Sequence, residues 1–564
     1  MDGIKKAILA QKVLASLLAI GLGGFVLPLA AQANSGLSDE PQDVKNTLVK
    51  YYMGTNGSKK NVVIIDSDLP DNNAGVIGGY TEYGDAENNS VSISDGTVKY
   101  VYGGYSYGYE DDGAYNNSIN ISGGTVTGVV VGGYSFQGPV SGNSIILSGT
   151  ADVSQAELLG YSFYLVHEGQ TDNKLIINGW SGKVQKLRNF NSIEVTALTG
   201  GLNLIVDEPT DFVFVENGIY NCDNLIKAEN IQAGVALTVS GDIVKNNGNL
   251  AIKATSVRAS DQTAITTESR AAAAAFVNQG AEAVSDSINS LQGAEAGIST
   301  FATVSGNNSK YDTGSYVDIN GWNGIVGVAK TKDLNAGKFS YGAFFENGGG
   351  NYNTYNDFNG TSFRGDGNVV YNGGGLLMRY EQENGVYTEA SLRAGTAKNE
   401  VSNALSDMDN KLYGFKTENA YYGAHIGIGK IIKLDNGKAW DIYGKYFHTH
   451  HEGDSVKIAN DVFDFDSVDS DKLRIGARFS EQQGEKLTSY YGLAWEYEFS
   501  GDAGGTANHY AMYTPSLEGS TVIGEVGFRY TPGKESPWYF DANVRGYAGM
   551  QEGISGSVQA VYSF

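Results

Sequence analysis

The chain has 564 residues, of which 76 are glycine, 36 tyrosine and 8 proline, and its formal net charge is -24. Glycine and tyrosine enrichment with little proline favours many short strands joined by tight turns, and argues against a helical or collagen-like protein. The acidic charge, without a cluster of lysine and arginine, argues against a nucleic-acid partner. The single cysteine, Cys222, excludes an intramolecular disulfide and an all-cysteine metal site.

Residues 1–33 carry the features of an export signal. Lysines open the segment, an apolar run follows over residues 13–30, and the small-residue sequence Ala-Gln-Ala ends at Ala33. This order predicts a secretory signal peptide cleaved between Ala33 and Asn34. The alternative is a retained membrane anchor, since the apolar run is nearly long enough to span, but glycines and Pro28 weaken such a helix. Later apolar runs are too short for a spanning helix, so any other membrane span must be a β-barrel.

A Gly-Tyr motif recurs in residues 34–258 at intervals of 25, 29 and 27 residues, ending at Tyr80, Tyr105, Tyr134 and Tyr161. A second repeated sequence lies between these copies, in the segments NNSVSISDGTV, NNSINISGGTV, GNSIILSGTADV and DNKLIINGWSGKV. Each unit holds two short strands and cannot bury its apolar face alone, so neighbouring units must stack. The pattern predicts a β-solenoid over residues 34–258, with candidate ladder or surface positions at Tyr102, Tyr105 and Tyr134.

The repeat region offers little catalytic chemistry. Its one histidine, His167, has no GxSxG or other serine-nucleophile motif near it, so a lone surface histidine is the better interpretation. The acidic residues Glu110, Asp111 and Asp112 could supply the paired carboxylates of a glycosidase, but they lie in a glycine-rich turn, where solvated side chains are the simpler interpretation. We therefore predict no catalytic, cofactor or metal site in these repeats.

A helix is predicted from Thr266 to about Leu291, within a linker of residues 259–300. Thr266 or Thr267 can cap it, Glu268 would sit in its positive first turn, and five successive alanines give high helix propensity. Such a helix extends roughly 39 Å at 1.5 Å per residue, enough to cross an outer membrane. Small side chains make it a narrow rod that suits enclosure by another element. An exposed linker helix is the alternative.

Residues 301–564 predict twelve strands, an even number as in bacterial outer-membrane barrels. The predicted ranges are 301–312, 315–331, 338–353, 365–382, 386–401, 418–434, 439–451, 468–481, 487–500, 519–531, 538–549 and 553–564. Starting with the second gap, short and long connections alternate. If the short turns face the periplasm, every long loop faces outside and both barrel termini lie on the periplasmic side. A soluble meander has no reason to sort its loops in this way.

Alternation within the later strands assigns their faces, because successive side chains point to opposite sides. Each of four strands carries apolar residues on one face and charges on the other. A charge facing lipid at the midplane costs about 2 to 4 kcal/mol, so the charges must face the lumen. The predicted lumen charges are Arg474, Arg478, Glu496, Glu498, Glu525, Arg529, Asp541 and Arg545. We expect the charged inner wall to bind the helix and to permit the passage of polar chain segments through the pore.

Two further features belong to the strand region. The histidine cluster consists of His448, His450 and His451, and a zinc or nickel site there is conceivable, although a solvated rim is the simpler interpretation. The chain ends in the sequence SGSVQAVYSF, whose alternate residues up to Tyr562 and Phe564 form one apolar face. This last strand is expected to close a sheet by pairing with the strand near Phe301.

The order of these parts resembles the monomeric autotransporters of Gram-negative bacteria, which are type V secretion proteins. The resemblance rests on the signal peptide, the glycine-rich repeats, the helix sequence ESRAAAAAFVNQGAE, the segment FATVSGNNSKYDTGSYVDINGW and the aromatic last residue. It implies an all-β fold with an N-terminal passenger β-solenoid, one α-helix in the pore and a 12-stranded antiparallel transmembrane β-barrel. It also implies transit through the Sec translocon and the barrel assembly machinery, which reads the terminal aromatic signal at Phe564 and Tyr562.

By this resemblance the chain is an outer-membrane protein, in contact with lipid, that delivers its own passenger to the cell surface. Adhesion to a host or sister cell, or self-association, is the expected passenger function, because a long polar stack offers an extended face without a catalytic pocket. The alternatives are an exported hydrolase, such as a protease, esterase or glycosidase, and a stalk without a specific ligand. Passenger self-cleavage has only weak candidates, Asn278 and Asn289.

Overall fold

The computed structural model describes residues 51–54, 58–70, 74–108, 111–164, 169–198, 211–216, 220–225, 228–292, 294–358, 360–407, 410–533 and 536–564. The predicted signal peptide, its cleavage site at Ala33 and Asn34, and His167 lie outside the described residues. Two compact units are present: Met1–Ile145 with Leu158–Asn173, and Ile146–Glu157 with Lys174–Phe564.

The N-terminal stretch is a parallel β-solenoid, as predicted. Its strands up to β12 are β1 (Tyr51–Met53), β2 (Val62–Asp66), β3 (Gly75–Thr81), β4 (Ala86–Glu87), β5 (Ser90–Asp95), β6 (Thr97–Ser106), β7 (Ala114–Tyr115), β8 (Ser118–Ile121), β9 (Thr125–Ser135), β10 (Val140–Ser141), β11 (Ser144–Ser148) and β12 (Glu157–Phe163). Strands β3, β6 and β9 stack in parallel, as do β2, β5 and β8, while β4, β7 and β10 form a third small sheet. The inward residues, such as Val91, Ile119 and Val126, are fully buried, so each coil completes the core of its neighbour.

A ladder of buried asparagines runs through the coils of the first unit. The ladder consists of Asn61, Asn89, Asn117, Asn143 and Asn173. The side-chain amides of the first four asparagines each donate a hydrogen bond to the amide oxygen of the next one, over 2.8 to 2.9 Å, and the Asn173 amide donates to the Val140 carbonyl at 2.8 Å. The ladder explains the repeated glycines, because a Cβ at Gly104 would lie 2.4 Å from the Asn117 amide nitrogen.

After β12 the pairing of the strands changes from parallel to antiparallel along the chain. These strands are β13 (Lys174–Asn178), β14 (Gly182–Lys183), β15 (Lys186–Leu198), β16 (Asp211–Glu216), β17 (Tyr220–Leu225), β18 (Ala228–Ala233), β19 (Leu237–Asn246) and β20 (Asn249–Ala259). Strands β13 and β15 pair in parallel, whereas β18, β19 and β20 form an antiparallel meander. The short helix η1 (Asp261–Thr263) then leads into α2 (Ala264–Asn289).

Helix α2 begins two residues before the predicted start, which corrects two predictions. Thr263 occupies the N-cap position and makes no side-chain capping bond, so neither Thr266 nor Thr267 is the cap. Both hydroxyls instead donate to backbone carbonyls three residues earlier, over 2.7 and 3.1 Å. Glu268 lies beyond the first turn and is fully buried. No helix among the described residues is long and apolar enough to cross a membrane.

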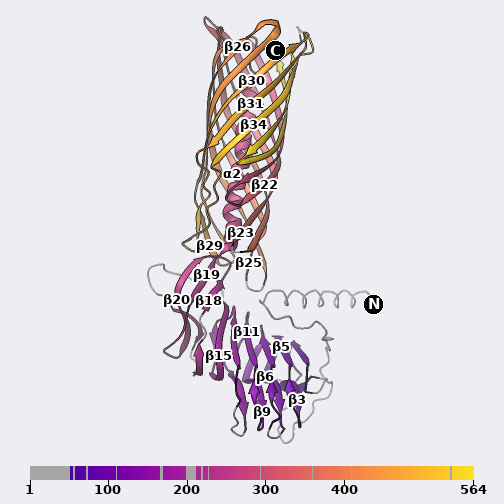
Figure 1. Ribbon diagram of the computed structural model, residues 1–564, viewed down its shortest axis with the longest axis vertical. Helices are drawn as coiled ribbons and strands as arrows, with labels where there is room; N and C mark the ends of the chain where they lie inside the picture. The colour runs from indigo at the N-terminus through magenta and orange to yellow at the C-terminus, as the bar shows by residue number, and fades with distance from the viewer. Residues whose placement is uncertain are drawn as a thin grey trace, which may run out of the picture. The chain divides into compact units, whose positions relative to one another are not determined.

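The remaining strands form the predicted closed barrel of twelve antiparallel strands around α2 (Figure 1). The barrel strands are β21 (Gly297–Asp312), β22 (Tyr316–Leu334), β23 (Gly337–Phe358), β24 (Thr361–Gln382), β25 (Val386–Ser406), β26 (Leu412–Lys433), β27 (Lys438–His451), β30 (Val468–Gln483), β31 (Leu487–Glu498), β34 (Gly519–Tyr530), β35 (Trp538–Gly549) and β36 (Gln551–Ser563). The 3-10 turn η2 (Asp435–Gly437) joins β26 to β27. Strand β36 pairs with β21, with Val561 opposite Phe301, so the predicted closing pair is confirmed.

Most of the segments predicted as long loops contain β-strands. The sequence between residues 353 and 365 continues β23 and β24 as a paired hairpin, because the alternation of inward and outward side chains persists to Phe358. Two other connections fold into a small sheet made of β28 (Asp454–Ile458), β29 (Asp461–Phe465), β32 (Gly505–Ala507) and β33 (Tyr510–Ala511). The two segments still connect consecutive barrel strands, as predicted, but they contain short strands that were not predicted. Strands β28 and β29 form a local hairpin, whereas β29 also pairs with β32, which is distant in sequence and cannot be recognised from local composition.

Candidate functional site

The barrel pore with α2 inside it is the candidate functional site. Almost every residue of the helix is buried; only Asp286 and Asn289 retain part of their exposure. Alanines at 271–275 keep the helix narrow, so its longer polar side chains can reach the wall at separate levels. The helix is therefore bound to the barrel by specific polar contacts that differ from one end to the other.

Near its N-terminus the helix has two charged side chains that make buried polar contacts. The Glu268 carboxylate accepts a hydrogen bond from the Thr313 hydroxyl, at 2.9 and 3.0 Å from its two oxygens. The Arg270 guanidinium donates to the Asn419 side chain at 2.9 Å and to the Glu452 carbonyl at 2.7 Å. These contacts fix the first two turns of α2 to three different parts of the wall.

The side chains in the middle of the helix contact the wall through neutral groups, the Arg393 guanidinium donates to the Val277 carbonyl at 3.0 Å, and at one residue the helix comes very close to the wall. Asn278 donates to the Ser470 hydroxyl at 2.9 Å, and Gln279 donates to the Tyr311 hydroxyl at 3.0 Å. At Gly280 the helix comes so near the wall that a Cβ would lie 2.3 Å from the Tyr371 hydroxyl oxygen. Glycine at this position permits the approach of helix and wall.

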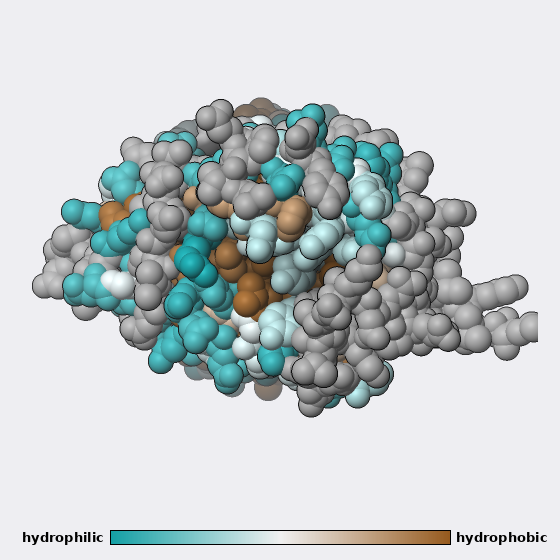
Figure 2. Space-filling model, turned by 90° about the horizontal axis from the view of Figure 1, so that it is seen from below, coloured by the Kyte–Doolittle hydropathy of each residue, from teal (hydrophilic) through white to brown (hydrophobic). Residues whose placement is uncertain are grey.

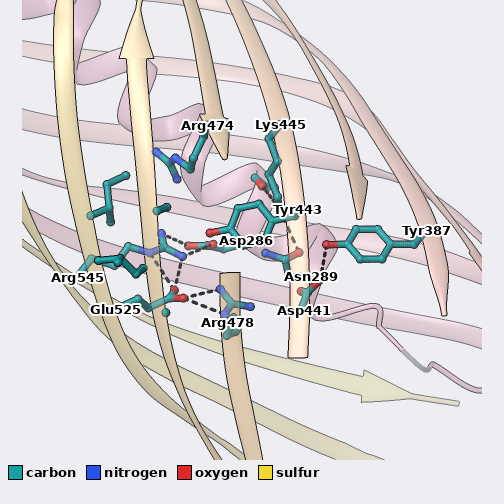
Figure 3. A pocket seen from close by; sticks show the side chains of 15 residues that line it. Asp286, Asn289, Tyr387, Asp441, Tyr443, Lys445, Arg474, Arg478, Glu525 and Arg545 are labelled. Carbon is teal, nitrogen blue, oxygen red and sulfur yellow. Dashed lines mark hydrogen bonds and ion pairs between the residues drawn. The ribbon is translucent and has the colours of Figure 1, made fainter. Parts of the chain in front are cut away.

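The C-terminal part of the helix carries its two acidic anchors. The carboxylate of Asp286 forms a bidentate pair with Arg545, with N–O distances of 2.6 and 2.8 Å (Figure 3). One turn earlier, Glu282 pairs with Arg474 at 2.7 Å. Lys445 donates to the Ser285 hydroxyl at 2.8 Å from another side of the barrel. The bidentate geometry of Asp286 with Arg545 restricts rotation and position together, so this pair, supported by Glu282 with Arg474, defines the register of α2.

The structure places all eight predicted lumen charges on the inner wall and brings most of them together in pairs. The pairs and their shortest N–O distances are Arg474 with Glu496 at 2.6 Å, Arg478 with Glu525 at 2.7 Å, Arg545 with Glu525 at 2.8 Å, and Arg529 with Asp541 at 3.1 Å. Glu498 accepts hydrogen bonds from the Ser470 hydroxyl and from the Asp471 backbone amide. Two of the wall arginines, Arg474 and Arg545, join the wall to the helix.

A second buried charge cluster on β23 to β27 was not predicted. Glu346 pairs with Arg393 at 2.9 Å. Glu389 is surrounded by Arg379 at 3.1 Å and Lys445 at 2.7 Å. Their inward positions follow the same period-two alternation that identified the later charges, so the signal was present in the sequence.

The three histidines do not form one site. His448 and His450 each pair with an aspartate on β30, Asp471 at 2.8 Å and Asp469 at 2.6 Å. His451 lies on the opposite face of the strand and is buried in the barrel. No group of three or more histidine, cysteine, aspartate or glutamate residues within the described ranges could hold a metal ion.

The helix leaves little open space in the pore. Two cavities beside it have volumes of about 20 Å³ each; one is lined by Asp286, Asn289 and Arg545, the other by Gln279, Glu282 and Asn307. A cavity of this size holds about one water molecule. With α2 in place, neither cavity is wide enough for an unfolded chain to pass.

The ends of the barrel sequence lie together at the seam between β21 and β36. Phe564 is 77% exposed, its ring lies 4.9 Å from the Tyr562 ring, and its backbone amide donates to the Ile298 carbonyl at 2.8 Å. The role of Tyr562 and Phe564 as an assembly signal stays a prediction.

Comparison with known proteins gives a family match and several structural neighbours. Residues 300–543 match the family model described as the autotransporter β-domain. The β-domain of the Bordetella autotransporter BrkA is 15% identical, over 48% of this chain and 100% of that chain, with a TM-score of 0.38. The translocator domain of NalP from Neisseria meningitidis is 15% identical, over 53% and 98%, with a TM-score of 0.41. The transport unit of AIDA-I from Escherichia coli is 12% identical, over 54% and 99%, with a TM-score of 0.39. No curated protein matches the chain.

Proposed function

Because residues 300–543 belong to the autotransporter β-domain family, we propose that the barrel delivers the solenoid of its own chain to the cell surface, where the solenoid acts in adhesion or self-association. An autotransporter β-domain is a translocator of the outer membrane and serves the secretion of a passenger. The chain is therefore an outer-membrane protein whose N-terminal part is exposed at the surface.

The observation that carries the adhesion proposal is a pair of aromatic rows on the solenoid. In the first row the rings of Tyr105 and Tyr134 stack with centroids 4.3 Å apart. In the second, Phe136 lies 4.8 Å from Tyr107 and 5.0 Å from Tyr164. Tyrosine provides a large, rigid contact area with a polar tip at a low cost in conformational entropy. Such rows are suited to binding another surface.

Two rings of the second row, Tyr107 and Tyr164, are available for contact and are 45% and 69% exposed. Tyr83, on the same solenoid but in neither row, is 76% exposed. Burial raises the pKa of the Tyr105 phenol, and the neighbouring Tyr134 raises it further, so the stacked row stays neutral at physiological pH. Figure 2 shows a face of the molecule on which hydrophobic residues near the centre lie among hydrophilic ones. Repeating the same contact on successive coils multiplies a weak interaction.

The anchoring of α2 supports adhesion as well, because an adhesin must transmit load to the membrane. The carboxylates of Glu282 and Asp286 pair with wall arginines inside the barrel. We propose that the eight lumen charges together hold the helix in the pore. Since the helix is continuous with the solenoid, a helix that is held in the pore keeps the solenoid on the cell.

The test is display of the full chain on a non-adherent, non-clumping host. A variant without residues 34–258 removes the solenoid, and the triple substitution Tyr83→Ser, Tyr107→Ser and Tyr164→Ser removes only exposed rings. The matched control replaces the same three tyrosines with phenylalanine, which retains the rings. Surface amounts are equalised by antibody labelling of intact cells.

We expect host-cell binding or clumping with the full chain, loss with the deletion and the serine variant, and retention with the phenylalanine control. Equal binding and clumping by the full chain and the deletion variant would contradict adhesion. Turnover of a protein, ester or glycan by the displayed solenoid would favour the exported hydrolase instead.

A further inference from the structure

The outer surface of the barrel has an apolar hollow at the seam where β36 closes on β21. This seam groove has a volume of about 600 Å³, and its outward-facing lining includes Ala302, Val326, Phe345, Trp538, Ala560 and Tyr562. Its residues form two rows across the strands: Tyr562 is opposite Thr300, which is opposite Val328, and Ala560 is opposite Ala302, which is opposite Val326.

The depth of the groove follows from side-chain size. Small side chains at Thr300, Ala302 and Ala560 form its floor, whereas Phe345 and Trp538 rise on its two sides and are 53% and 43% exposed. An aromatic ring and a small residue on adjacent strands leave a channel along the sheet surface, because side chains stand roughly perpendicular to the sheet.

The wall behind the groove is also unusual within this barrel. Its lumen side carries an apolar cluster that includes Phe301, Phe344 and Val561 from the wall, and Val284 and Ile288 from α2. Other levels of the lumen are lined by ion pairs. Close packing of this cluster against the helix gives the groove a rigid floor, and rigid hollows bind a ligand with a smaller entropic cost than deformable ones.

A positive rim lies at one end of the groove. Lys330 and Lys332 are exposed and follow Val326 and Val328 on the same face of β22, toward the short turn that joins β22 to β23. Lys330 is opposite Tyr341, and the Lys332 ammonium lies 5.6 Å from the centre of the Tyr341 ring. Lysine and aromatic residues at the edge of an apolar band occupy the headgroup level of a bilayer.

We propose that the seam groove is a specific phospholipid site, in which one acyl chain lies over Ala302 and Ala560 and the phosphate pairs with Lys330 or Lys332. Lipid tails are as apolar as the groove, so the hydrophobic effect does not select a bound lipid over a bulk one. The selection comes from van der Waals contact with the shaped floor and from the pairing of phosphate with ammonium. The lipid would cover the seam, where the first and last strands of the barrel meet.

The experiment is native mass spectrometry of the purified full chain in a phosphate-free detergent, titrated with phosphatidylglycerol. Ala302→Phe fills the groove. The matched control is Ala424→Phe, the same change at an outward position on β26 away from the groove. Lys330→Gln with Lys332→Gln removes the rim charge at exposed positions. A difference in gel mobility between the unheated and the heated protein confirms that each variant is a folded barrel.

We expect one tightly bound phosphatidylglycerol on the unaltered chain and on Ala424→Phe, with an apparent Kd raised about tenfold by Ala302→Phe. The lysine double variant should raise the Kd several-fold. Equal binding by Ala302→Phe and Ala424→Phe would overturn the proposal, as would the absence of a saturable adduct on the unaltered chain. If Ala302→Phe does not fold, unchanged binding by the lysine variant overturns it.

Discussion

The solenoid and the barrel bury polar groups in opposite ways. In the solenoid the buried groups are neutral amides, one asparagine per coil, and each makes the same bond to the next. In the barrel they are ion pairs with different partners at each level, such as Glu282 with Arg474 and Asp286 with Arg545. The asparagine bond of the solenoid repeats along the solenoid axis, whereas each ion pair of the barrel occurs once.

The difference corresponds to what each interior has to specify. A ladder of identical amides satisfies every donor wherever another coil is added, so it favours stacking without fixing the number of coils. Charges are costly to bury, and a pair can be replaced by apolar groups at little cost to stability, so buried pairs are better explained by the positional information that they provide. Here that information is the register of α2 in the pore.

The largest expected effect is in the barrel. Arg545→Leu leaves the Asp286 carboxylate, whose side chain is 13% exposed, without its cation. An uncompensated buried charge typically costs about 3 to 5 kcal/mol, and the partial exposure of Asp286 places the cost toward the lower value. Glu525 retains Arg478 as a partner, so the loss should come chiefly from the helix contact. We expect a lower urea midpoint for loss of the folded form, measured by gel mobility of the unheated protein.

The double variant Asp286→Leu with Arg545→Leu separates charge pairing from packing. If the pair specifies register more than stability, the double variant should be more stable than Arg545→Leu alone, because no charge remains unpaired on the helix. A double variant less stable than both single variants would show that the pair itself stabilises the barrel.

The next largest effect is expected in the solenoid, from Asn117→Ala. The substitution removes the oxygen that accepts from both the backbone and the side-chain N–H of Asn89, and the amide that donates to the Ala86 carbonyl. Each buried group left unsatisfied costs about 1 to 3 kcal/mol. Faster proteolysis of the displayed solenoid on intact cells measures the loss. Asn120→Ala is the matched control, since the Asn120 side-chain oxygen has no hydrogen-bond partner. Equal proteolysis of the two variants would show that the ladder contributes little.

The sequence permitted prediction of much of the barrel. Inward and outward residues alternate along β30, β31, β34 and β35, and the lipid-facing side excludes charge, so strand number and face followed from local pattern. Which charges meet could not be predicted, because alternation gives a face but not the helix residue beside it. Asp286 pairs with Arg545 across 259 positions of sequence, and nothing local to either residue indicates that contact.

In the solenoid the missed feature was visible in the sequence. The ladder asparagines are separated by 28, 28, 26 and 30 residues, and they stand at the start of the repeats that predicted the stacking. Their burial was not predicted because asparagine is usually exposed or in turns. A polar residue that recurs with the structural period is better interpreted as a ladder position.

A smaller effect is expected where helix and wall approach most closely. Gly280→Ala adds a methyl group 2.3 Å from the Tyr371 hydroxyl, which also donates to Asn323 at 2.9 Å and is not free to move away. The gain in helix propensity, about 1 kcal/mol, offsets part of the strain, so we expect a net loss of about 1 to 2 kcal/mol. Tyr371→Phe combined with Gly280→Ala removes the obstructing oxygen and should recover most of the urea midpoint. If the urea midpoint does not recover, the strain caused by Gly280→Ala does not come from contact with the Tyr371 hydroxyl.

The smallest expected effect is the coupling energy between aromatic rings on neighbouring coils of the solenoid. Tyr105→Leu and Tyr134→Leu each remove one ring of a stacked pair, and such pairs contribute about 0.5 to 1.5 kcal/mol beyond area burial. In a double-mutant cycle based on the proteolysis of displayed solenoid, the two changes should show a coupling of this size. Tyr105→Leu combined with Phe163→Leu should be additive, because a one-dimensional stack transmits energy only to adjacent units. Coupling between the distant pair equal to that between Tyr105 and Tyr134 would mean that the solenoid, like the barrel, behaves as one cooperative interior.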